Sequence, residues 1–194
     1  MIKLFRLLYF LRILKLFPQY FFHYEVRKFV KKGDVVIDIG ANQGIYTKIF
    51  SDCGAFIFAI EPLKQFNKYF KKFGNCHLSN VALGGEEKPV RFNQWRNSSG
   101  AYEIAFDDNG EYEYKLQSYM VKGSELFNPL PKINFIKIDV EGSELPIIED
   151  MAELILKHKP TILIETDKIA EVLSYLKGYE VIKQVSNDYL IGVI

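Results

Sequence analysis

The chain has 194 residues, of which 48% are hydrophobic and 25% are charged, a length and composition typical of one folded domain. The two cysteines, Cys53 and Cys76, form at most a single pair and show no Cys-x-x-Cys spacing, which excludes a disulfide scaffold and a zinc ribbon. The net charge of +1 combines a basic segment, residues 1–32 with eight Lys and Arg against Glu25, and an acidic remainder. An acidic body argues against nucleic acid as the partner, and cysteines that form no scaffold favour a reducing, cytoplasmic location.

We expect the basic segment to be an apolar helical extension ahead of a domain over residues 33–194. Arg12 and Lys15 interrupt the apolar residues, so no uncharged run reaches the ~20 residues of a membrane span, and no small-residue cleavage site follows. A helix is predicted ahead of Pro18. Two interpretations stay open for it: packing on the domain, which we favour, or peripheral contact of residues 1–17 with a membrane or a partner.

Strand and helix signals alternate after this extension. Short apolar runs next to Gly, Pro or Asp predict strands, and the longer stretches between them predict helices. Up to residue 81 the predicted order is strand Val35–Ile39, helix Ile45–Cys53, strand Phe56–Ile60, helix Leu63–Phe73 and strand His77–Val81. This order predicts a parallel sheet with helices on both faces and right-handed crossovers.

The middle of the chain, residues 84–131, has a different pattern. Strand Val90–Gln94, a polar loop, the turn Asp107–Gly110 and strand Tyr112–Val121 together predict an antiparallel hairpin. We expect this hairpin to extend the edge of the parallel sheet.

The parallel pattern resumes in the last third of the chain. The predicted elements are strand Phe135–Val140, helix Leu145–His158, strand Thr161–Glu165, helix Lys168–Leu176, and strands Tyr179–Gln184 and Tyr189–Ile194. The last two strands are joined by a link too short for a crossover helix, so they must be antiparallel.

A turn containing two glycines, Asp38-Ile39-Gly40-Ala41-Asn42-Gln43-Gly44, follows the first strand. Gly40 and Gly44 allow the backbone to bend sharply near a ligand, and the next helix offers unpaired N–H groups. Asp38 can accept a hydrogen bond from a cation or a hydroxyl group. Dinucleotide sites have the spacing Gly-x-Gly-x-x-Gly, whereas here Asn42 takes the middle position and the last gap is one residue short, which disfavours pyrophosphate binding.

Acidic residues end three of the predicted parallel strands. Glu61 lies 21 residues after Gly40, where doubly wound folds place the carboxylate that binds the hydroxyls of an adenosine ribose; a solvated loop carboxylate is the alternative. Asp139 and Glu141 lie at the rim where such folds place their chemistry. With Glu165 they carry oxygen ligands that suit Mg²⁺, but the spacing does not require a metal. A divalent cation therefore stays an open alternative, and no metal ligand is assigned.

Five segments of the chain resemble the FkbM-type branch of S-adenosylmethionine-dependent methyltransferases: Asp38–Gly44, Ala59–Pro62, Asn80–Gly84, Ile136–Glu144 and Ile162–Glu165. The resemblance covers residues 35–194, and its most specific part is Asp-Val-Glu-Gly-x-Glu. It implies the class I methyltransferase fold, a Rossmann-like three-layer α/β sandwich with a mostly parallel seven-stranded sheet and an antiparallel C-terminal strand. It also implies transfer of a methyl group from S-adenosyl-L-methionine to oxygen, often a sugar or polyketide hydroxyl.

The resemblance also implies roles for single residues. The methionine part of the cofactor would lie against the turn, the ribose against Glu61 and the adenine against the end of the third strand; these cofactor-binding residues are Asp38, Gly40, Ala41, Asn42, Gly44, Glu61, Asn80 and Val81. We interpret Asp139 and Glu141 as the catalytic carboxylates, with Asp139 accepting the proton of the acceptor hydroxyl.

The predicted function is therefore O-methylation of a sugar hydroxyl in a glycan or glycoconjugate. One alternative is a docking module that keeps the fold without turnover at a membrane or partner surface, which the basic extension favours. Another is an oxidoreductase on the same sheet, which the glycine spacing and the closing hairpin disfavour. The sequence leaves the acceptor and the oligomeric state open.

Overall fold

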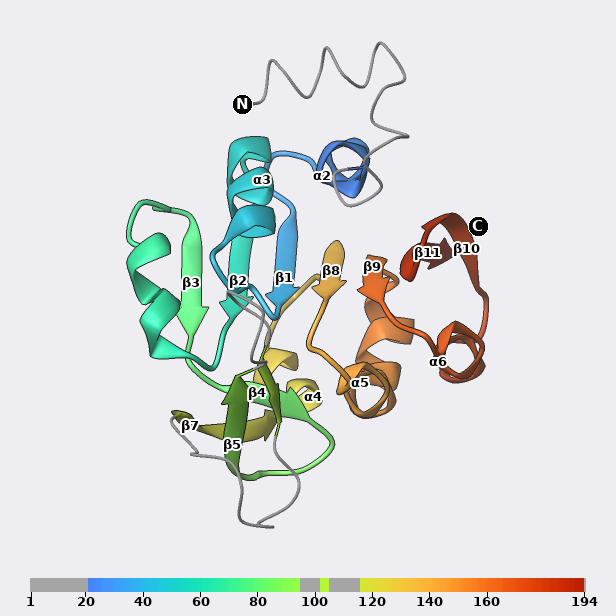
Figure 1. Cartoon of the computed structure of the whole chain (residues 1–194). Helices are drawn as coiled ribbons and strands as arrows, with labels where there is room; N and C mark the ends of the chain where they lie inside the picture. Colours follow the sequence, from blue (N-terminus) through green and yellow to red (C-terminus); the bar gives the residue numbers. More distant parts are fainter. Residues whose placement is uncertain (1–20, 95–101, 105–115, 194) are drawn as a thin grey trace.

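A seven-stranded sheet runs through the computed structural model, which describes residues 21–94, 102–104 and 116–193 (Figure 1). The strand order is β10-β11-β9-β8-β1-β2-β3. These strands span, in chain order, β1 Val35–Ile39, β2 Phe56–Ile60, β3 Cys76–Ser79, β8 Phe135–Ile138, β9 Thr161–Glu165, β10 Tyr179–Val185 and β11 Asp188–Val193. All neighbouring pairs are parallel except those of β11, which is antiparallel to both β9 and β10. The predicted parallel sheet with an antiparallel C-terminal strand is confirmed.

Helices cover both faces of the sheet, and each face has its own hydrophobic core. On one face, α2 (Phe21–Glu25), the 3₁₀ helix η3 (Val26–Lys28) and α3 (Ile45–Cys53) pack with Val36 and Ile57 of the strands. On the other face, α4 (Gly123–Phe127), α5 (Glu144–His158) and α6 (Ile169–Tyr175) pack with Ile37, Ile39 and Ile136. Strands buried on both sides must be apolar at nearly every position, which is why the central strands read as continuous Val, Ile and Phe runs.

The segment after β2 differs from the predicted helix Leu63–Phe73. It forms the 3₁₀ helix η4 (Lys64–Tyr69), followed by further turns with bonds such as Phe73 N–H to Phe70 O at 3.0 Å. The buried rings of Phe66, Phe70 and Phe73 explain the difference, because they draw this stretch onto the core where tertiary packing outweighs local helix propensity.

The third strand ends at Ser79 and not at Val81 as predicted, because Asn80 turns the chain. Its side-chain amide donates to Glu61 O at 2.8 Å and to Asn67 Oδ1 at 2.9 Å, and its own oxygen accepts from Asn67 Nδ2 at 2.9 Å. The chain then leaves the large sheet.

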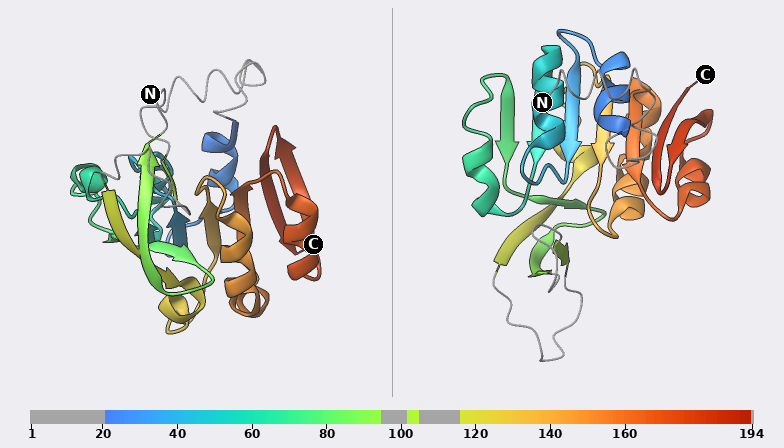
Figure 2. Two further views of the ribbon diagram at one scale, coloured as in Figure 1. Left: turned by 60° about the horizontal axis from the view of Figure 1, so that its bottom comes forward. Right: turned by 45° about the horizontal axis from the view of Figure 1, so that its top comes forward.

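The expected edge hairpin is instead part of a separate four-stranded sheet, so its predicted place was wrong. This sheet has the order β4-β7-β5-β6 and contains β4 Ala82–Gly84, β5 Lys88–Gln94, β6 Tyr102–Ile104 and β7 Leu116–Lys122. Strands β5 and β7 are antiparallel as predicted, whereas β4 and β7 are parallel. The turn Asp107–Gly110 lies outside the described residues. Figure 2 shows the small sheet beyond the carboxyl ends of β1 and β2.

The described part of the N-terminal extension packs on the body of the protein. Phe22, Val26 and Val30 are buried in the core, and the fully buried carboxylate of Glu25 pairs with Lys28 at 2.6 Å and with Lys183 of β10. The helix predicted ahead of Pro18 lies outside the described residues. Of the helices that the structure describes, none has the length and apolar character needed to cross a membrane.

Candidate active site

The turn between β1 and α3 is pressed against the ends of both neighbouring strands. The N–H groups of Gly40 and Ala41 donate to Ile60 O of β2 at 3.0 and 3.1 Å. Gly40 has a φ of 73°, and a Cβ at this position would lie 1.8 Å from the backbone oxygen of Asp139. Glycine is therefore required here both for the left-handed conformation and for the close approach of the loop after β8.

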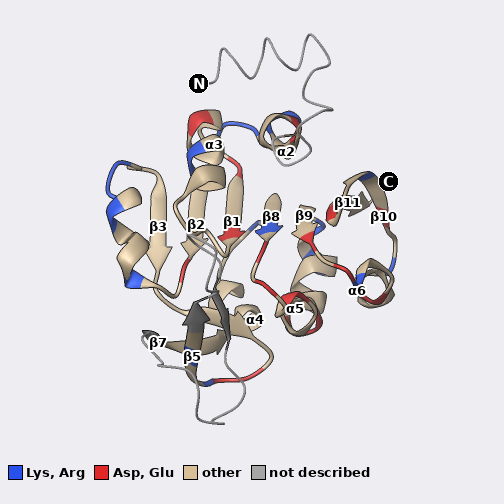
Figure 3. Ribbon diagram, in the orientation of Figure 1, with Lys and Arg blue, Asp and Glu red and all other residues tan. Residues whose placement is uncertain are grey.

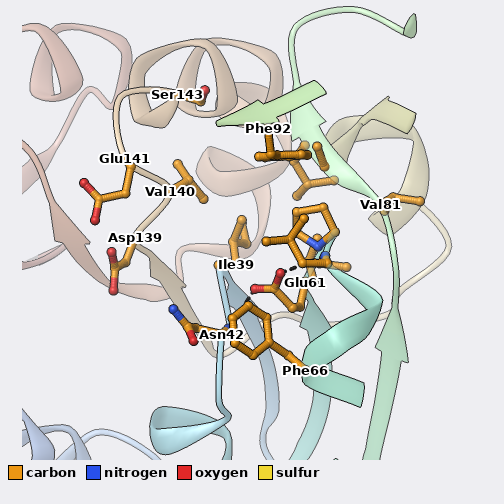
Figure 4. Close-up of a pocket in the computed structure, with 16 residues that line it drawn as sticks. Ile39, Asn42, Glu61, Phe66, Val81, Phe92, Asp139, Val140, Glu141 and Ser143 are labelled. Atoms are coloured by element: carbon orange, nitrogen blue, oxygen red, sulfur yellow. Dashed lines mark hydrogen bonds between the residues drawn. The ribbon is translucent and has the colours of Figure 1, made fainter. Parts of the chain in front are cut away.

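Glu61 is 5% exposed at the end of β2, and main-chain donors hold its carboxylate (Figure 4). Asn42 N–H donates to Oε2 and Leu63 N–H donates to Oε1, both at 2.8 Å. Burial raises the pKa of Glu61, and these two backbone hydrogen bonds oppose the rise. Each carboxylate oxygen has a second lone pair, so Glu61 keeps the capacity to accept from a ligand.

A cleft opens beside Glu61, with about 680 Å³ of space including its mouth. Its lining comes from four places: the end of β1, the end of β2 with η4, the small sheet, and the loop after β8. The lining residues are Ile39, Gly40, Asn42, Ile60, Glu61, Pro62, Leu63, Phe66, Val81, Ala82, Leu83, Phe92, Asp139, Val140, Glu141 and Ser143. Apolar walls with a few carboxylates suit an aromatic ring attached to a polyhydroxyl group.

The structure brings six of the ten predicted site residues to this cleft: Gly40, Asn42, Glu61, Val81, Asp139 and Glu141. The other four are not among the lining residues. Asp38 is fully buried and accepts from Thr47 Oγ1 at 2.5 Å, Ala41 is 5% exposed, and Gly44 is the N-cap of α3 with a φ of 73°. Asn80 is bound to Asn67 and to the backbone of Glu61. These four residues shape the turn and the strand ends that present the lining.

Asp139 and Glu141 stand on the opposite side of the cleft from Glu61, in the loop after β8 (Figure 4). The Asp139 side chain is 37% exposed, and its Oδ2 lies 3.0 Å from Lys137 Nζ. Glu141 adopts a left-handed backbone with a φ of 53°, and Gly142 follows at 97°. Two consecutive residues with positive φ turn the chain sharply, so the carboxylate-bearing loop projects at the strand ends.

Further carboxylates lie next to this loop, on β9 and β11. Glu165 and Asp188 are partners in the antiparallel register of these strands. Partial burial, followed by the charges of Asp139, Asp188 and Glu141, raises the pKa of Glu165 to about 7. Burial and the charge of Asp139 raise the pKa of Asp188 to about 6. The carboxylates at this rim therefore lie close enough for the negative charge of one to raise the pKa of another.

Sequence reasoning missed Lys137, Tyr46 and Asp188. Lys137 is the charged residue inside the apolar strand β8, and it lies opposite Asp38 in the register of β1 and β8. A lysine within a strand predicted to be buried on both faces is a usable signal, because a buried ammonium requires a partner. Tyr46 and Asp188 carry no comparable local signal.

The open alternative of a divalent cation gains no support from this geometry. Within residues 21–94, 102–104 and 116–193, no three His, Cys, Asp or Glu side chains are arranged to hold a metal ion. Asp139 is paired with an ammonium instead.

The strand order and the cleft at the carboxyl ends of the strands define a class I methyltransferase fold. Solved structures support this assignment of the fold. An FkbM methyltransferase from Methylobacillus flagellatus KT superposes with a TM-score of 0.58 at 16% identity, over 82% of this chain and 43% of that one. A putative methyltransferase from Streptococcus mutans in complex with SAH gives a TM-score of 0.50 at 12% identity, over 90% of this chain and 96% of the other.

The sequence comparisons identify the family. The model of the methyltransferase FkbM domain matches residues 38–181, and the chain belongs to this family. A curated relative, the hexuronic acid methyltransferase AglP of Haloferax volcanii, is 29% identical over 132 residues, which are 62% of this chain and 51% of that protein. The chain thus spans about half the length of this relative.

Proposed function

We propose that the protein transfers a methyl group from S-adenosyl-L-methionine to a hydroxyl group of a sugar. The observation that carries the proposal is the placement of Glu61 and Asp139 on facing walls of one cleft, within the segment that matches the FkbM domain. The name of the relative AglP, a methyltransferase of a hexuronic acid, supports a carbohydrate acceptor.

The residues around the cleft fit the cofactor. Glu61 has lone pairs left for ribose hydroxyls, Val81 and Phe92 offer apolar surface to a purine, and the turn at Gly40 provides a close backbone approach. Bound S-adenosylmethionine would supply an electrophilic methyl group. An oxidoreductase is disfavoured, because the β1–α3 turn lacks the third glycine spacing of a dinucleotide site.

Asp139 and Glu141 supply the polar groups of the acceptor side. An alcohol is a poor nucleophile until its proton can leave, and a carboxylate within hydrogen-bonding distance accepts that proton. Asp139 is partly exposed and held by Lys137 at 3.0 Å, so it can contact an acceptor in the cleft while its position stays restricted. Restricting the reacting groups to a productive arrangement accounts for much of the acceleration expected of such a transfer.

The test combines binding with turnover. Calorimetry should detect binding of S-adenosylhomocysteine to the purified chain, and labelled methyl groups should pass to a sugar in a panel of neutral and uronic-acid glycans. Asp139→Asn keeps the shape of the side chain but removes the proton acceptor, so turnover should fall ~10²–10⁴-fold with the cofactor affinity nearly unchanged.

Each failure in this experiment has a distinct meaning. Binding of S-adenosylhomocysteine without transfer to any glycan would refute the sugar acceptor. Absence of S-adenosylhomocysteine binding would favour the alternative of a docking module, which the basic extension also favours. Full turnover of Asp139→Asn at saturating cofactor would show that the carboxylates after β8 are structural.

Two finer proposals concern the surroundings of the enzyme. A location in the cytoplasm is consistent with the two free cysteines, Cys53 and Cys76. Peripheral contact of residues 1–17 with a membrane stays a prediction, since these residues lie outside the described part of the chain.

A further inference from the structure

Lys137 belongs to the family-like segment Ile136–Glu144, two residues before its most specific part, but it does not line the cleft. It stands in β8, whose four residues are all buried, and its side chain is 5% exposed. Removing an ammonium from water is unfavourable unless hydrogen bonds and opposite charges compensate. The partners of this lysine therefore indicate what it does.

The ammonium group contacts three separate parts of the candidate site. Nζ lies 3.0 Å from Asp139 Oδ2, donates to the backbone oxygen of Gly40 at 3.0 Å, and lies 3.9 Å from Asp38 Oδ1. The ring of Tyr46 packs against it with its centroid 5.4 Å away. A single nitrogen thus joins β1, the glycine turn and the loop that carries Asp139. In Figure 3 a basic stretch of β8 lies between the acidic ends of β1 and β9.

The groups around Lys137 keep it charged. Burial lowers its pKa, but the charges of Asp139, Asp38 and Glu165 more than offset this effect, so the pKa of Lys137 is raised. From α3 the Tyr46 hydroxyl faces the same carboxylates and has a raised pKa, mainly through burial. The pKa of His23 on α2 is lowered to about 4 by burial and by Lys137, so this imidazole is neutral near pH 7. From β11, Asp188 adds negative charge, and its own pKa is raised by burial and by the charge of Asp139.

These contacts oppose a displacement of Asp139. Its neighbours Glu141, Glu165 and Asp188 are carboxylates, which repel it when ionised, and its side chain is open enough to take another rotamer. The ammonium supplies a charge-assisted hydrogen bond on the buried side and thereby favours one orientation. The same ammonium holds the Gly40 carbonyl, so the orientation of Asp139 is tied to the position of the turn.

We propose that Lys137 is a positioning residue that holds the Asp139 carboxylate and the glycine turn in a fixed relation. This inference rests on the proposed function for its kinetic consequence, because Asp139 is the proton acceptor there. The structural contact itself does not depend on that function. Both parts can be tested separately.

The kinetic test is a double-mutant cycle with Lys137→Gln and Asp139→Asn. In the wild-type background, Lys137→Gln should lower kcat at saturating cofactor and acceptor by ~10–100-fold, a part of the effect of a positioned base. In the Asp139→Asn background the same substitution should change kcat less than about twofold, because Lys137 acts through a carboxylate that is already absent. Equal losses in both backgrounds would overturn the proposal, since a merely structural lysine acts independently of Asp139. Lys132→Gln is the control, because this exposed lysine bonds only to His158 O among the contacts described and should leave kcat unchanged.

Lys137→Gln leaves the carboxylate of Asp38 buried without a cation, which lowers the stability of the variant. If Lys137→Gln does not fold, Lys137→Arg takes its place in the double-mutant cycle. Lys137→Arg retains the positive charge, so it should turn over faster than Lys137→Gln if both variants fold.

A second measurement needs no variant of Lys137. The ¹⁵N resonance of the Lys137 ammonium should shift between wild type and Asp139→Asn, and it should shift again when S-adenosylhomocysteine binds. An unchanged resonance in Asp139→Asn would refute the contact between Lys137 and Asp139, whatever the activity of the protein. A shifted resonance in a protein that is inactive on every glycan would refute only the proposed function.

Discussion

Two carboxylates of the cleft are held by different kinds of donor. Glu61 is bound by the neutral N–H groups of Asn42 and Leu63, whereas Asp139 is bound by the ammonium of Lys137. Backbone donors cannot move without moving the turn, so Glu61 is fixed as a part of the wall. Asp139 is held from its buried side by one charged side-chain donor, while its other side is partly exposed.

Glu61→Gln tests the first of these roles. The amide NH₂ of glutamine would face one of the two backbone N–H groups, so one hydrogen bond is lost and two donors confront each other. We expect the affinity for S-adenosylhomocysteine to fall ~10–150-fold, the equivalent of the ~1.5–3 kcal/mol typical of a hydrogen bond to a charged group. Calorimetry measures this loss, with Glu87→Gln as the control at an exposed carboxylate. Equal affinities of wild type and Glu61→Gln would contradict the assignment of this residue to the ribose.

Local sequence patterns predicted the site residues whose position depends only on where a single strand ends. Gly40, Glu61 and Asp139 follow buried strands, and parallel strands bring their carboxyl ends to one edge of the sheet. The contacts of Lys137 could not be predicted, because they depend on the register between β1 and β8, which are about 100 residues apart in the chain.

At the level of elements, the strand ends depend on glycines for two separable reasons. Gly40 and Gly33 both have positive φ, 73° and 88°, but a Cβ at Gly33 meets nothing within 4 Å. Gly33→Ala should therefore cost only the backbone strain, about 1–2 kcal/mol in free energy of unfolding. Gly40→Ala adds the clash with Asp139 O, so it should cost at least ~2 kcal/mol more and also weaken S-adenosylhomocysteine binding. Urea denaturation of both variants makes the comparison, and equal losses of stability would show that the close approach at Gly40 is unimportant.

Elements that form from local signals were predicted well, and those that require distant partners were not. The apolar runs of the large sheet appear at their expected places, and the helix predicted over Leu145–His158 is α5, which begins one residue earlier at Glu144. The small sheet could not be predicted, because it joins β4 to β7 across more than 30 residues of intervening chain. The position of Gly84 shows the long-range fit: a Cβ there would lie 2.3 Å from Met120 Sδ.

On the scale of the whole molecule, the acidic groups are not spread evenly. Asp139, Glu165 and Asp188 come from three elements and gather where the strands end, around the single ammonium of Lys137. Such a rim repels anions, so within the proposed function a neutral polyol binds there more favourably than a uronate in the same orientation. A uronic-acid acceptor would need to direct its carboxylate away from this rim.

The same crowding makes the stability of the protein depend on pH. The pKa of Glu165 is raised to about 7, by partial burial and by the charges of Asp139 and Asp188, whereas an unfolded glutamate titrates near 4.5. The folded protein therefore binds more protons at this residue than the unfolded chain between about pH 4.5 and 7, and its contribution to stability is lost as the pH rises through about 7. His23 acts in the opposite direction, because its pKa is lowered from 6.5 to about 4 by burial, and stability that it contributes above pH 6.5 is lost as the pH falls.

Glu165→Gln separates these two effects, because it removes the carboxylate and leaves His23 in place. At pH 8 the variant should be more stable than wild type in urea denaturation, since Glu165 is ionised among Asp139, Glu141 and Asp188 in the wild-type protein. At pH 4.5 the two proteins should differ little, because the wild-type side chain is then protonated and resembles the amide. Glu171→Gln, at an exposed position of α6, provides a control whose effect should not depend on pH in this way. An equal change in stability at pH 4.5 and pH 8 would show that the carboxylates at the rim do not repel one another. There would then be no repulsion of Asp139 for Lys137 to counter.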